Sequence, residues 1–462
     1  MPSPSPGYSI TVRVDVPAGA TATAALTTAV GSAGGALTAL DVVESHTSRM
    51  VVDVTCDTSG EAHAQEITKA IAEIPGAAMR KVSDRTFLMH LGGKIEVTPK
   101  VPLKHRDDLS RAYTPGVARV CLAIAEHPED ARRLTIKRNT VAVVTDGSAV
   151  LGLGNIGAAA ALPVMEGKAA LFKQFGGVDA WPVCLDTQDT DTLVEIVRAM
   201  APVYGGINLE DISAPRCFEI EARLREMLDI PVFHDDQHGT AIVVLAALTN
   251  ALRVVGKRIE DLSIVVSGVG AAGNAIIRLL LAQGATDIIG CGRNGAVHSG
   301  QEGMDQFRSW VAENTNSANR SGSLKDVLVG ADVFIGVSAP NLLTGEDIAT
   351  MADKAIVFAL ANPVPEVDAV EASKHAAVVA TGRSDYPNQI NNVLVFPGFF
   401  RGLLDSGVSD ITDQMLIAAA SAIANTVRAD QLNASYIVPS VFDTTVAPAV
   451  AAAVLEVATS TG

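Results

Sequence analysis

The chain has 462 residues, of which 48% are apolar, and a formal charge of −16 at pH 7. A chain of this length holds about two to four domains. The negative charge argues against nucleic-acid binding, because it would repel phosphate backbones. No uninterrupted apolar run approaches the roughly 20 residues that cross a bilayer, and the N-terminus lacks the basic-then-apolar pattern of a signal peptide. Five scattered cysteines favour reduced thiols, so we expect a cytoplasmic protein without a membrane partner.

The first segment, residues 1–95, has the pattern of a small α/β module. Strand-like and helix-like stretches alternate in the order β-α-β-β-α-β, at 8–16, 21–34, 37–45, 49–56, 61–74 and 78–87. This is the order of a ferredoxin-like fold, and the pattern resembles the ACT domains attached to metabolic enzymes. Two interpretations stay open: a dimerisation module without a ligand, and a module that binds a small-molecule effector.

The rest of the chain divides into three further predicted parts. Residues 96–240 form an α/β domain, and 241–410 show apolar strands alternating with helices, as in a doubly wound parallel sheet of the Rossmann type. Residues 411–462 are mainly helical, and we expect them to pack back onto the core. The predicted fold class is therefore α/β, with a ferredoxin-like module at the N-terminus.

The G-x-G-x-x-G spacing occurs twice, in a first loop at 152–157 and a second loop at 268–273. Pyrophosphate binding needs a buried strand before the glycines and a helix after them. The second loop has that context. Around the first loop, Asp146 and Gly147 predict a hairpin, and Pro163 is expected to interrupt the next helix near its start. We therefore assign the dinucleotide to the second loop, at Gly268, Val269, Gly270, Ala271, Ala272 and Gly273.

The strand after the second loop bears on the choice of cofactor. NAD-binding sites place an acidic residue at the end of this strand, on the ribose 2′-hydroxyl. Here Gly292 stands at that position and is followed by Arg293. The missing acid and the added cation favour the 2′-phosphate of NADP over NAD. The alternative is that Arg293 stacks on adenine and that either cofactor binds.

Two acidic pairs follow apolar strands and predict a metal site. Glu210 and Asp211 end one strand, and Asp235 and Asp236 end another. Such pairs would repel each other unless a cation neutralises them, and oxygen ligands favour Mg²⁺ or Mn²⁺. Helix capping and ordinary surface charge are the alternatives for single acids. The histidine pair at 234 and 238 lies outside a convincing helix, so we interpret it as packing or hydrogen bonding rather than as a zinc site.

Two further residues are candidates for proton transfer. Lys168 lies in a nearly uncharged, glycine-rich stretch, where its pKa would be depressed beside a divalent cation and it could act as a base. Tyr113 lies in a turn set by Pro115 and Gly116 and could donate a proton. A solvated lysine and a core tyrosine are the ordinary alternatives.

Together these stretches resemble the malic enzymes of the small bacterial type. The resemblance runs from Arg106 to the C-terminus and rests on a series of motifs in matching order: AYTPGVA, VVTDGSAVLGLGNIG, PVMEGKAALF, INLEDI, FHDDQHGTAIV, SGVGAAG, ALANPVPE and NNVLVFPG. It assigns the first glycine loop to the malate-binding domain. The N-terminal module and the pair Gly292-Arg293 lie outside the family pattern.

The resemblance implies a role for each matching residue. Tyr113 would be the proton donor and Lys168 the proton acceptor, with Asp235 as partner of Lys168. The metal ligands would be Glu210, Asp211 and Asp236, while Asn362 and Asn392 would contact the nicotinamide and the substrate carboxylate.

The implied reaction is oxidative decarboxylation of (S)-malate to pyruvate and CO₂, with NAD or NADP and with Mg²⁺ or Mn²⁺, in a homodimer or higher homo-oligomer. The alternatives are malolactic decarboxylation to lactate with bound NAD, an amino-acid dehydrogenase, and a non-catalytic metabolite sensor coupled to the ACT-like module. Net production of NAD(P)H and a strict metal requirement would separate the implied reaction from these alternatives.

Overall fold

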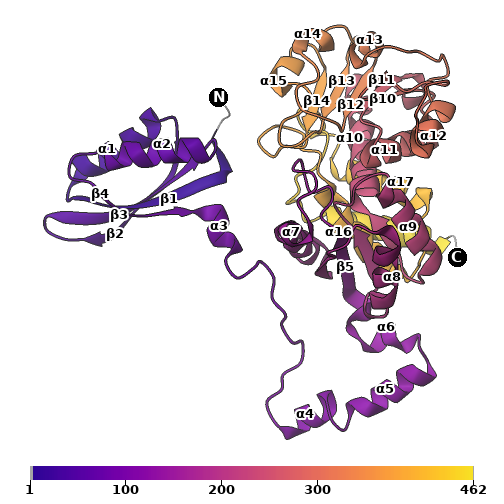
Figure 1. The fold of residues 1–462 in the computed structure, drawn as a ribbon, viewed down its shortest axis with the longest axis horizontal. Helices are drawn as coiled ribbons and strands as arrows, with labels where there is room; N and C mark the ends of the chain where they lie inside the picture. The colour runs from indigo at the N-terminus through magenta and orange to yellow at the C-terminus, as the bar shows by residue number, and fades with distance from the viewer. Residues whose placement is uncertain (1–3, 461–462) are drawn as a thin grey trace. The chain divides into compact units, whose positions relative to one another are not determined.

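The computed structural model describes residues 4–460 and divides into two compact units, Met1–Val97 and Thr98–Gly462 (Figure 1). The first unit has the predicted β-α-β-β-α-β order followed by a short helix. Its elements are β1 (Ser5–Pro17), α1 (Ala20–Ser32), β2 (Ala36–Ser45), β3 (Arg49–Thr58), α2 (Glu61–Ala72), β4 (Ala78–Asp84) and α3 (Arg85–His90).

The sheet of the first unit is antiparallel, in the order β2-β3-β1-β4. Alternate residues of β1, such as Val12 and Val14, pack with Leu26 of α1 and Ile67 of α2, so the helices cover one face of the sheet. The prediction of an extended segment to residue 87 is wrong at its end. Asp84 accepts hydrogen bonds from the backbone N–H groups of Thr86 and Phe87, and this cap starts α3.

The second unit begins with a first lobe, residues 98–239. Three short helices lead into a four-stranded sheet that is parallel throughout, in the order β6-β5-β7-β8. The elements are α4 (Arg106–Ala112), α5 (Val117–Glu126), α6 (Asp130–Leu134), η1 (Ile136–Asn139), β5 (Thr140–Thr145), α7 (Ala158–Gly176), β6 (Asp179–Cys184), α8 (Thr190–Met200), η2 (Ala201–Val203), β7 (Gly206–Leu209), α9 (Arg216–Met227), β8 (Val232–His234) and η3 (Asp235–Gly239).

Two predictions for the first lobe are wrong. The chain does not form a hairpin at Asp146 and Gly147, since both neighbours of β5 are parallel strands and the apolar run after it forms an exposed turn at 151–154. Helix α7 also continues through Pro163. Pro163 lies in the second helical turn, where it removes one backbone hydrogen bond, while the buried face of the helix, including Met165 and Phe172, still packs in the core.

The second lobe, residues 240–460, contains the predicted Rossmann sheet. Its order is β11-β10-β9-β12-β13-β14, with β11 antiparallel at one edge and the other strands parallel. The strands are β9 (Ser263–Ser267), β10 (Asp287–Gly292), β11 (Gly295–Ala296), β12 (Val333–Gly336), β13 (Ile356–Ala359) and β14 (Val378–Thr381). The helices are α10 (Thr240–Val255), η4 (Ile259–Asp261), α11 (Ala271–Ala282), α12 (Gln306–Asn314), α13 (Leu324–Leu328), α14 (Gly345–Ile348), α15 (Ala369–Ala372), η5 (Asn392–Leu394), α16 (Phe396–Ser406), α17 (Asp413–Thr426) and α18 (Val446–Ser460).

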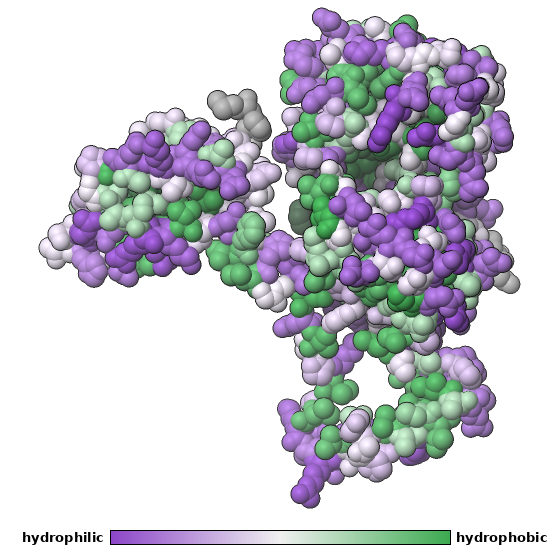
Figure 2. All heavy atoms as spheres, in the orientation of Figure 1, coloured by the Kyte–Doolittle hydropathy of each residue, from purple (hydrophilic) through white to green (hydrophobic). Residues whose placement is uncertain are grey.

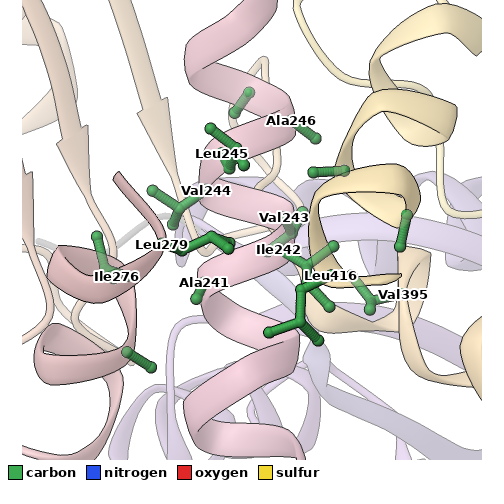
Figure 3. Packing of buried hydrophobic residues seen from close by; sticks show 14 of the residues in the cluster. Ala241, Ile242, Val243, Val244, Leu245, Ala246, Ile276, Leu279, Val395 and Leu416 are labelled. Atoms are coloured by element: carbon green, nitrogen blue, oxygen red, sulfur yellow. The ribbon is translucent and has the colours of Figure 1, made fainter. Parts of the chain in front are cut away.

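Helix α10 contributes buried residues to the largest core cluster of the second unit (Figure 3). It packs against α11 and α17 through residues such as Ile276 and Leu416. The same core cluster holds Val143 of the first lobe and Val266 of the second, so one continuous core joins the two lobes. Within residues 4–460, the stretch Asp235–Val255 has the length and composition of a membrane span, but 72% of its most apolar window is buried inside the protein. A helix that is apolar all round is here a core helix.

Candidate active site

A buried ion cluster lies where the strands β7 and β8 end. The chain leaves β7 at Leu209 and β8 at His234, so the two acidic pairs come out at the same edge of the parallel sheet. Helix α7 brings Lys168 to this edge. Its Nζ atom lies 2.5 Å from Asp235 Oδ2 and 2.9 Å from Glu210 Oε1. The structure therefore brings together three residues that are up to 67 positions apart in the sequence.

Three carboxylates beside Lys168 form a compact group. One oxygen each of Glu210, Asp211 and Asp236 lies within 4.8 Å of the others. Burial, together with repulsion from neighbouring carboxylates, raises the pKa of Asp211 to about 8, of Glu210 to about 7 and of Asp236 to about 6. Asp211 Oδ2 is buried and has no hydrogen-bond partner among the described residues. Three converging hard oxygen ligands, one of them unpartnered, fit Mg²⁺ or Mn²⁺.

The local backbone fixes these carboxylates. Asp211 has a positive φ of 54°, and its N–H donates to Asp236 Oδ2 at 2.8 Å, which joins the two acidic pairs. Asp235 and Asp236 lie in η3, a single turn of π-helix, a conformation that often occurs at functional sites. A Cβ on Gly239 would lie 1.9 Å from Asp235 Oδ1, so only glycine leaves room for that carboxylate.

The depressed pKa of Lys168 is predicted only beside a divalent cation and stays a prediction, whereas the protein groups by themselves raise it. Burial lowers the pKa of Lys168, but the carboxylates of Asp235 and Glu210 together outweigh burial and raise it. The Nζ atom also lies 4.2 Å from the centre of the Phe396 ring, which favours a cation. A divalent cation among the carboxylates would act in the opposite direction, because it would repel the ammonium.

Asn208 and Glu221 support the cluster or the helical turn beside it and were not predicted from the sequence. Asn208 donates to Glu210 Oε2 at 2.9 Å from within strand β7. Glu221 of α9 accepts hydrogen bonds from Gln237 at 3.0 Å and His238 at 2.7 Å and so holds η3 in place. Buried polar residues in otherwise apolar stretches were the available sequence signal, but their partners are distant in the chain. The contact of His238 with Glu221 agrees with hydrogen bonding rather than zinc ligation.

Of the two predicted substrate and nicotinamide residues, Asn392 contacts this cluster. Asn392 donates a short hydrogen bond to Asp235 Oδ2, the same oxygen that pairs with Lys168. A Cβ on Gly152 would come 2.6 Å from the backbone oxygen of Asn362. The first glycine loop therefore packs against the loop that carries Asn362.

The second glycine loop borders a cavity of about 1020 Å³. Gly268, Val269 and Gly270 line it, as do Gly292 and Arg293 at the end of β10. Residues 271–273 form the first turn of α11, whose N-terminus follows the loop. The cavity thus has the dinucleotide context of strand, glycine turn and helix.

Tyr113 is not part of the cluster in a single chain. It follows α4 with 65% of its surface exposed. Its hydroxyl makes no hydrogen bond to the cluster among residues 4–460. Neither α4 nor α5 has a buried residue, and Figure 2 shows apolar side chains gathered on this segment at the bottom of the view.

Comparisons with known proteins agree with this architecture. Two family models match the chain: "Malic enzyme, N-terminal domain" over residues 92–225 and "Malic enzyme, NAD binding domain" over residues 237–459. An NAD-dependent malic enzyme of Geobacillus stearothermophilus is 56% identical over 454 residues, which cover 98% of this chain and 95% of that protein.

An NADP-dependent malic enzyme of Escherichia coli (strain K12) is 47% identical over 387 residues, which cover 79% of this chain and 51% of that protein. The crystal structure of an NAD-dependent malic enzyme from Thermotoga maritima superposes with a TM-score of 0.78 at 47% identity and covers 81% of this chain and 99% of that one. On this evidence the chain belongs to the malic enzyme family.

Proposed function

We propose that the chain catalyses the metal-dependent oxidative decarboxylation of (S)-malate to pyruvate and CO₂, with reduction of NAD or NADP. The observation that carries the proposal is the buried cluster in which Lys168 contacts Asp235 and Glu210 beside two further carboxylates. The relatives named as malic enzymes support it over most of the chain length.

Each residue of the cluster has a proposed role. Glu210, Asp211 and Asp236 hold the divalent cation. When bound, the cation increases the acidity of the malate 2-hydroxyl, and the dinucleotide accepts hydride from C2. Lys168 accepts the hydroxyl proton, and Asp235 positions its amino group.

The remaining predicted residues act on the substrate and the nicotinamide. After the C4 carboxylate leaves as CO₂, Tyr113 donates a proton to C3 and pyruvate results. We assign Asn392 to the substrate carboxylate, because it shares the Asp235 oxygen with Lys168. Asn362 is assigned to the nicotinamide side.

One assay tests the reaction. The purified protein is incubated with malate and NAD or NADP, with Mn²⁺ or with a chelator, and pyruvate, lactate and NAD(P)H are measured. We expect equal amounts of pyruvate and NAD(P)H, and only with the metal. Lactate without net NAD(P)H would indicate malolactic activity, and turnover that survives the chelator would contradict the metal site.

For the cofactor we propose a preference for NADP over NAD. Gly292 leaves no carboxylate to repel a 2′-phosphate, and Arg293 lines the same cavity. Within residues 4–460, Arg293 forms no ion pair, which leaves its guanidinium available to a phosphate. Relatives named for each cofactor exist, so kcat/KM measured with both cofactors decides the preference.

We also propose that the active protein is a homo-oligomer in which Tyr113 completes the site of a second copy. The exposed apolar segment around Tyr113 is the supporting observation. Mixing Lys168→Ala and Tyr113→Phe subunits tests it. If two copies share their sites, mixed dimers contain one intact site, and about a quarter of the parent activity returns. No recovery after verified subunit exchange would place both residues in one chain.

For residues 1–95 we propose an ACT-like module that dimerises the chain or binds a small-molecule effector. The relative that matches 98% of this chain extends over most of this region. For the chain after residue 95 we propose three parts, with bounds at 96–240, 241–410 and 411–462. We also propose that the protein is cytoplasmic. Measuring the oligomeric state and the malate kinetics after deletion of residues 1–95 separates assembly from regulation.

A further inference from the structure

A second buried carboxylate lies outside the catalytic cluster. Glu366 follows β13 and is fully buried. Its Oε1 atom accepts hydrogen bonds from the Ser338 N–H at 2.8 Å and the Ser338 hydroxyl at 3.4 Å, and its Oε2 atom accepts one from the Ala361 N–H at 3.0 Å. Glu366 thereby ties the loop after β12 to the loop after β13.

These hydrogen bonds favour the ionised form of the Glu366 carboxyl. Each oxygen of Glu366 accepts a hydrogen bond from a backbone N–H. An ionised carboxylate accepts at both oxygens, whereas a carboxylic acid uses one oxygen as an O–H donor. Burial raises the pKa of Glu366 above its ordinary value, and the hydrogen bonds from Ser338 and Ala361 offset only part of that rise. Within residues 4–460 no lysine, arginine or histidine forms an ion pair with Glu366. A buried anion without a cation is unfavourable for stability, so its presence calls for a functional reason.

The neighbouring sequence makes room for this charge. A Cβ on Gly336, the last residue of β12, would lie 2.4 Å from Glu366 Cδ. The carboxylate therefore occupies a space that a larger residue at position 336 would fill. This close fit keeps the charge at the carboxyl ends of β12 and β13.

The sheet order places Glu366 relative to the dinucleotide. The second glycine loop follows the central strand β9, with β10 on one side and β12 and β13 on the other. Arg293, the proposed adenosine-side cation, follows β10 and lines the cavity. The nicotinamide end then belongs on the β12 side, where Ser338 lines the same cavity and where Asn362 follows β13. Ser338 is also the residue to which Glu366 binds.

We propose that Glu366 is the buried counter-charge of the oxidised nicotinamide ring and makes the site prefer the oxidised over the reduced cofactor. The inference rests on one part of the proposed function, which is that the chain binds a dinucleotide with its nicotinamide beside Ser338. The oxidised ring carries a positive charge, and the reduced ring is neutral. A fixed negative charge therefore stabilises NAD(P)⁺ and has little effect on NAD(P)H, which favours release of the reduced product.

The test compares binding of the two redox forms of one cofactor. Dissociation constants of NADP⁺ and NADPH are measured by calorimetry for the parent and for Glu366→Gln, and the NAD⁺/NADH pair is used if the parent prefers it. We expect the variant to weaken binding of the oxidised form about tenfold relative to the reduced form, because it removes a charge that attracts only the oxidised ring. Equal weakening of both forms would mean that Glu366 only holds the loops, and would overturn the proposal.

Two further variants separate charge from structure. Glu366→Asp keeps the charge but is too short to reach both loops, so we expect weaker binding of both forms with the parent's ratio. Glu366→Asp also tests the proposal if Glu366→Gln does not fold. A change in the ratio of the two dissociation constants in Glu366→Asp would overturn the proposal. Glu371→Gln is the matched control, since Glu371 is an exposed carboxylate on α15 paired with Lys374. A parent that binds neither form contradicts the proposed function itself.

Discussion

The two glycine loops have the same spacing but different structures. The second loop follows β9 and leads directly into α11, with its backbone lining a cavity of about 1020 Å³. The first loop is packed against protein on two sides. A Cβ on Gly147 would lie 2.3 Å from the backbone of Gly157, and one on Gly152 would lie 2.6 Å from the Asn362 oxygen.

This difference shows what glycine supplies in each case. In the second loop Gly270 has no atom within 4 Å of its Cβ position and lines the cavity, while Gly268 and Gly273 let backbone segments approach closely. Around the first loop Gly147 and Gly152 also let segments of protein approach each other, but they border no part of that cavity. Gly157 has a φ of 82° and starts α7, the helix that carries Lys168. The first loop therefore positions a side chain, while the second forms a binding surface.

The largest expected effect concerns the helix started by the first loop. Lys168→Ala should lower the rate of malate oxidation by the ~10² to 10⁴ typical of general-base loss. Lys173→Ala is the control on the same helix, because Lys173 is exposed and pairs with Asp179. Steady-state kcat with malate measures the effect. A Lys168 variant as active as the Lys173 variant would remove Lys168 from the mechanism.

The next effect concerns the carboxylates beside that helix. Asp236→Asn should weaken Mn²⁺ binding by at least the ~10- to 100-fold that loss of an outer-shell partner costs, since here a charged ligand is lost. Direct Mn²⁺ titration measures the affinity without relying on turnover. Asp229→Asn, at an exposed position, is the control. Unchanged Mn²⁺ affinity would contradict the ligand assignment.

The third effect concerns the strand that follows the second loop. A Cβ on Gly292 would have Val269 as its nearest neighbour at 3.7 Å, so Gly292→Asp fits without overlap. The new carboxylate should bind a ribose 2′-hydroxyl and repel a 2′-phosphate. A charge-assisted hydrogen bond of about 1.5 to 3 kcal/mol corresponds to a roughly 10- to 100-fold swing towards NAD in kcat/KM. An unmoved ratio would place cofactor specificity elsewhere.

The smallest effect tests the comparison of the loops directly. A Cβ at position 273 would lie 1.7 Å from the Gly268 oxygen. Overpacking costs about 1 to 3 kcal/mol, or roughly fivefold to a little over a hundredfold in an equilibrium, and a loop that can shift gives the low end of that range. We expect Gly273→Ala to raise the KM of the dinucleotide and Gly152→Ala to raise the KM of malate.

The control for this pair is Gly31→Ala. Gly31 lies in α1, and no atom surrounds its Cβ position within 4 Å. The thermal unfolding of all three variants is measured alongside the kinetics. The same KM change in both loop variants would show that the loops do not differ in function.

Local pattern was sufficient for much of the fold. Apolar alternation and apolar runs identified the parallel strands of both α/β sheets and the β-α-β-β-α-β order of the first unit, because burial of one or both faces imposes a period on the sequence. The two-residue edge strand β11 was not predicted. The acidic pairs were also visible, since carboxylates directly after apolar strands must meet at one sheet edge. Pattern failed at Pro163 and at Asp146, where packing of α7 and parallel pairing of β5 overrode local turn preferences.

By itself, then, the sequence determined the strand order along the chain, the second glycine loop and the types of residue available for chemistry. Only the tertiary structure decided which of these residues meet. It placed Lys168 between Asp235 and Glu210, raised its pKa through their charges, and brought Asn392 to the same oxygen. It also buried Glu366 against Ser338. The physical reason is that burial and Coulomb interaction depend on distance in space, whereas sequence periodicity reports only the environment of each residue along its own strand or helix.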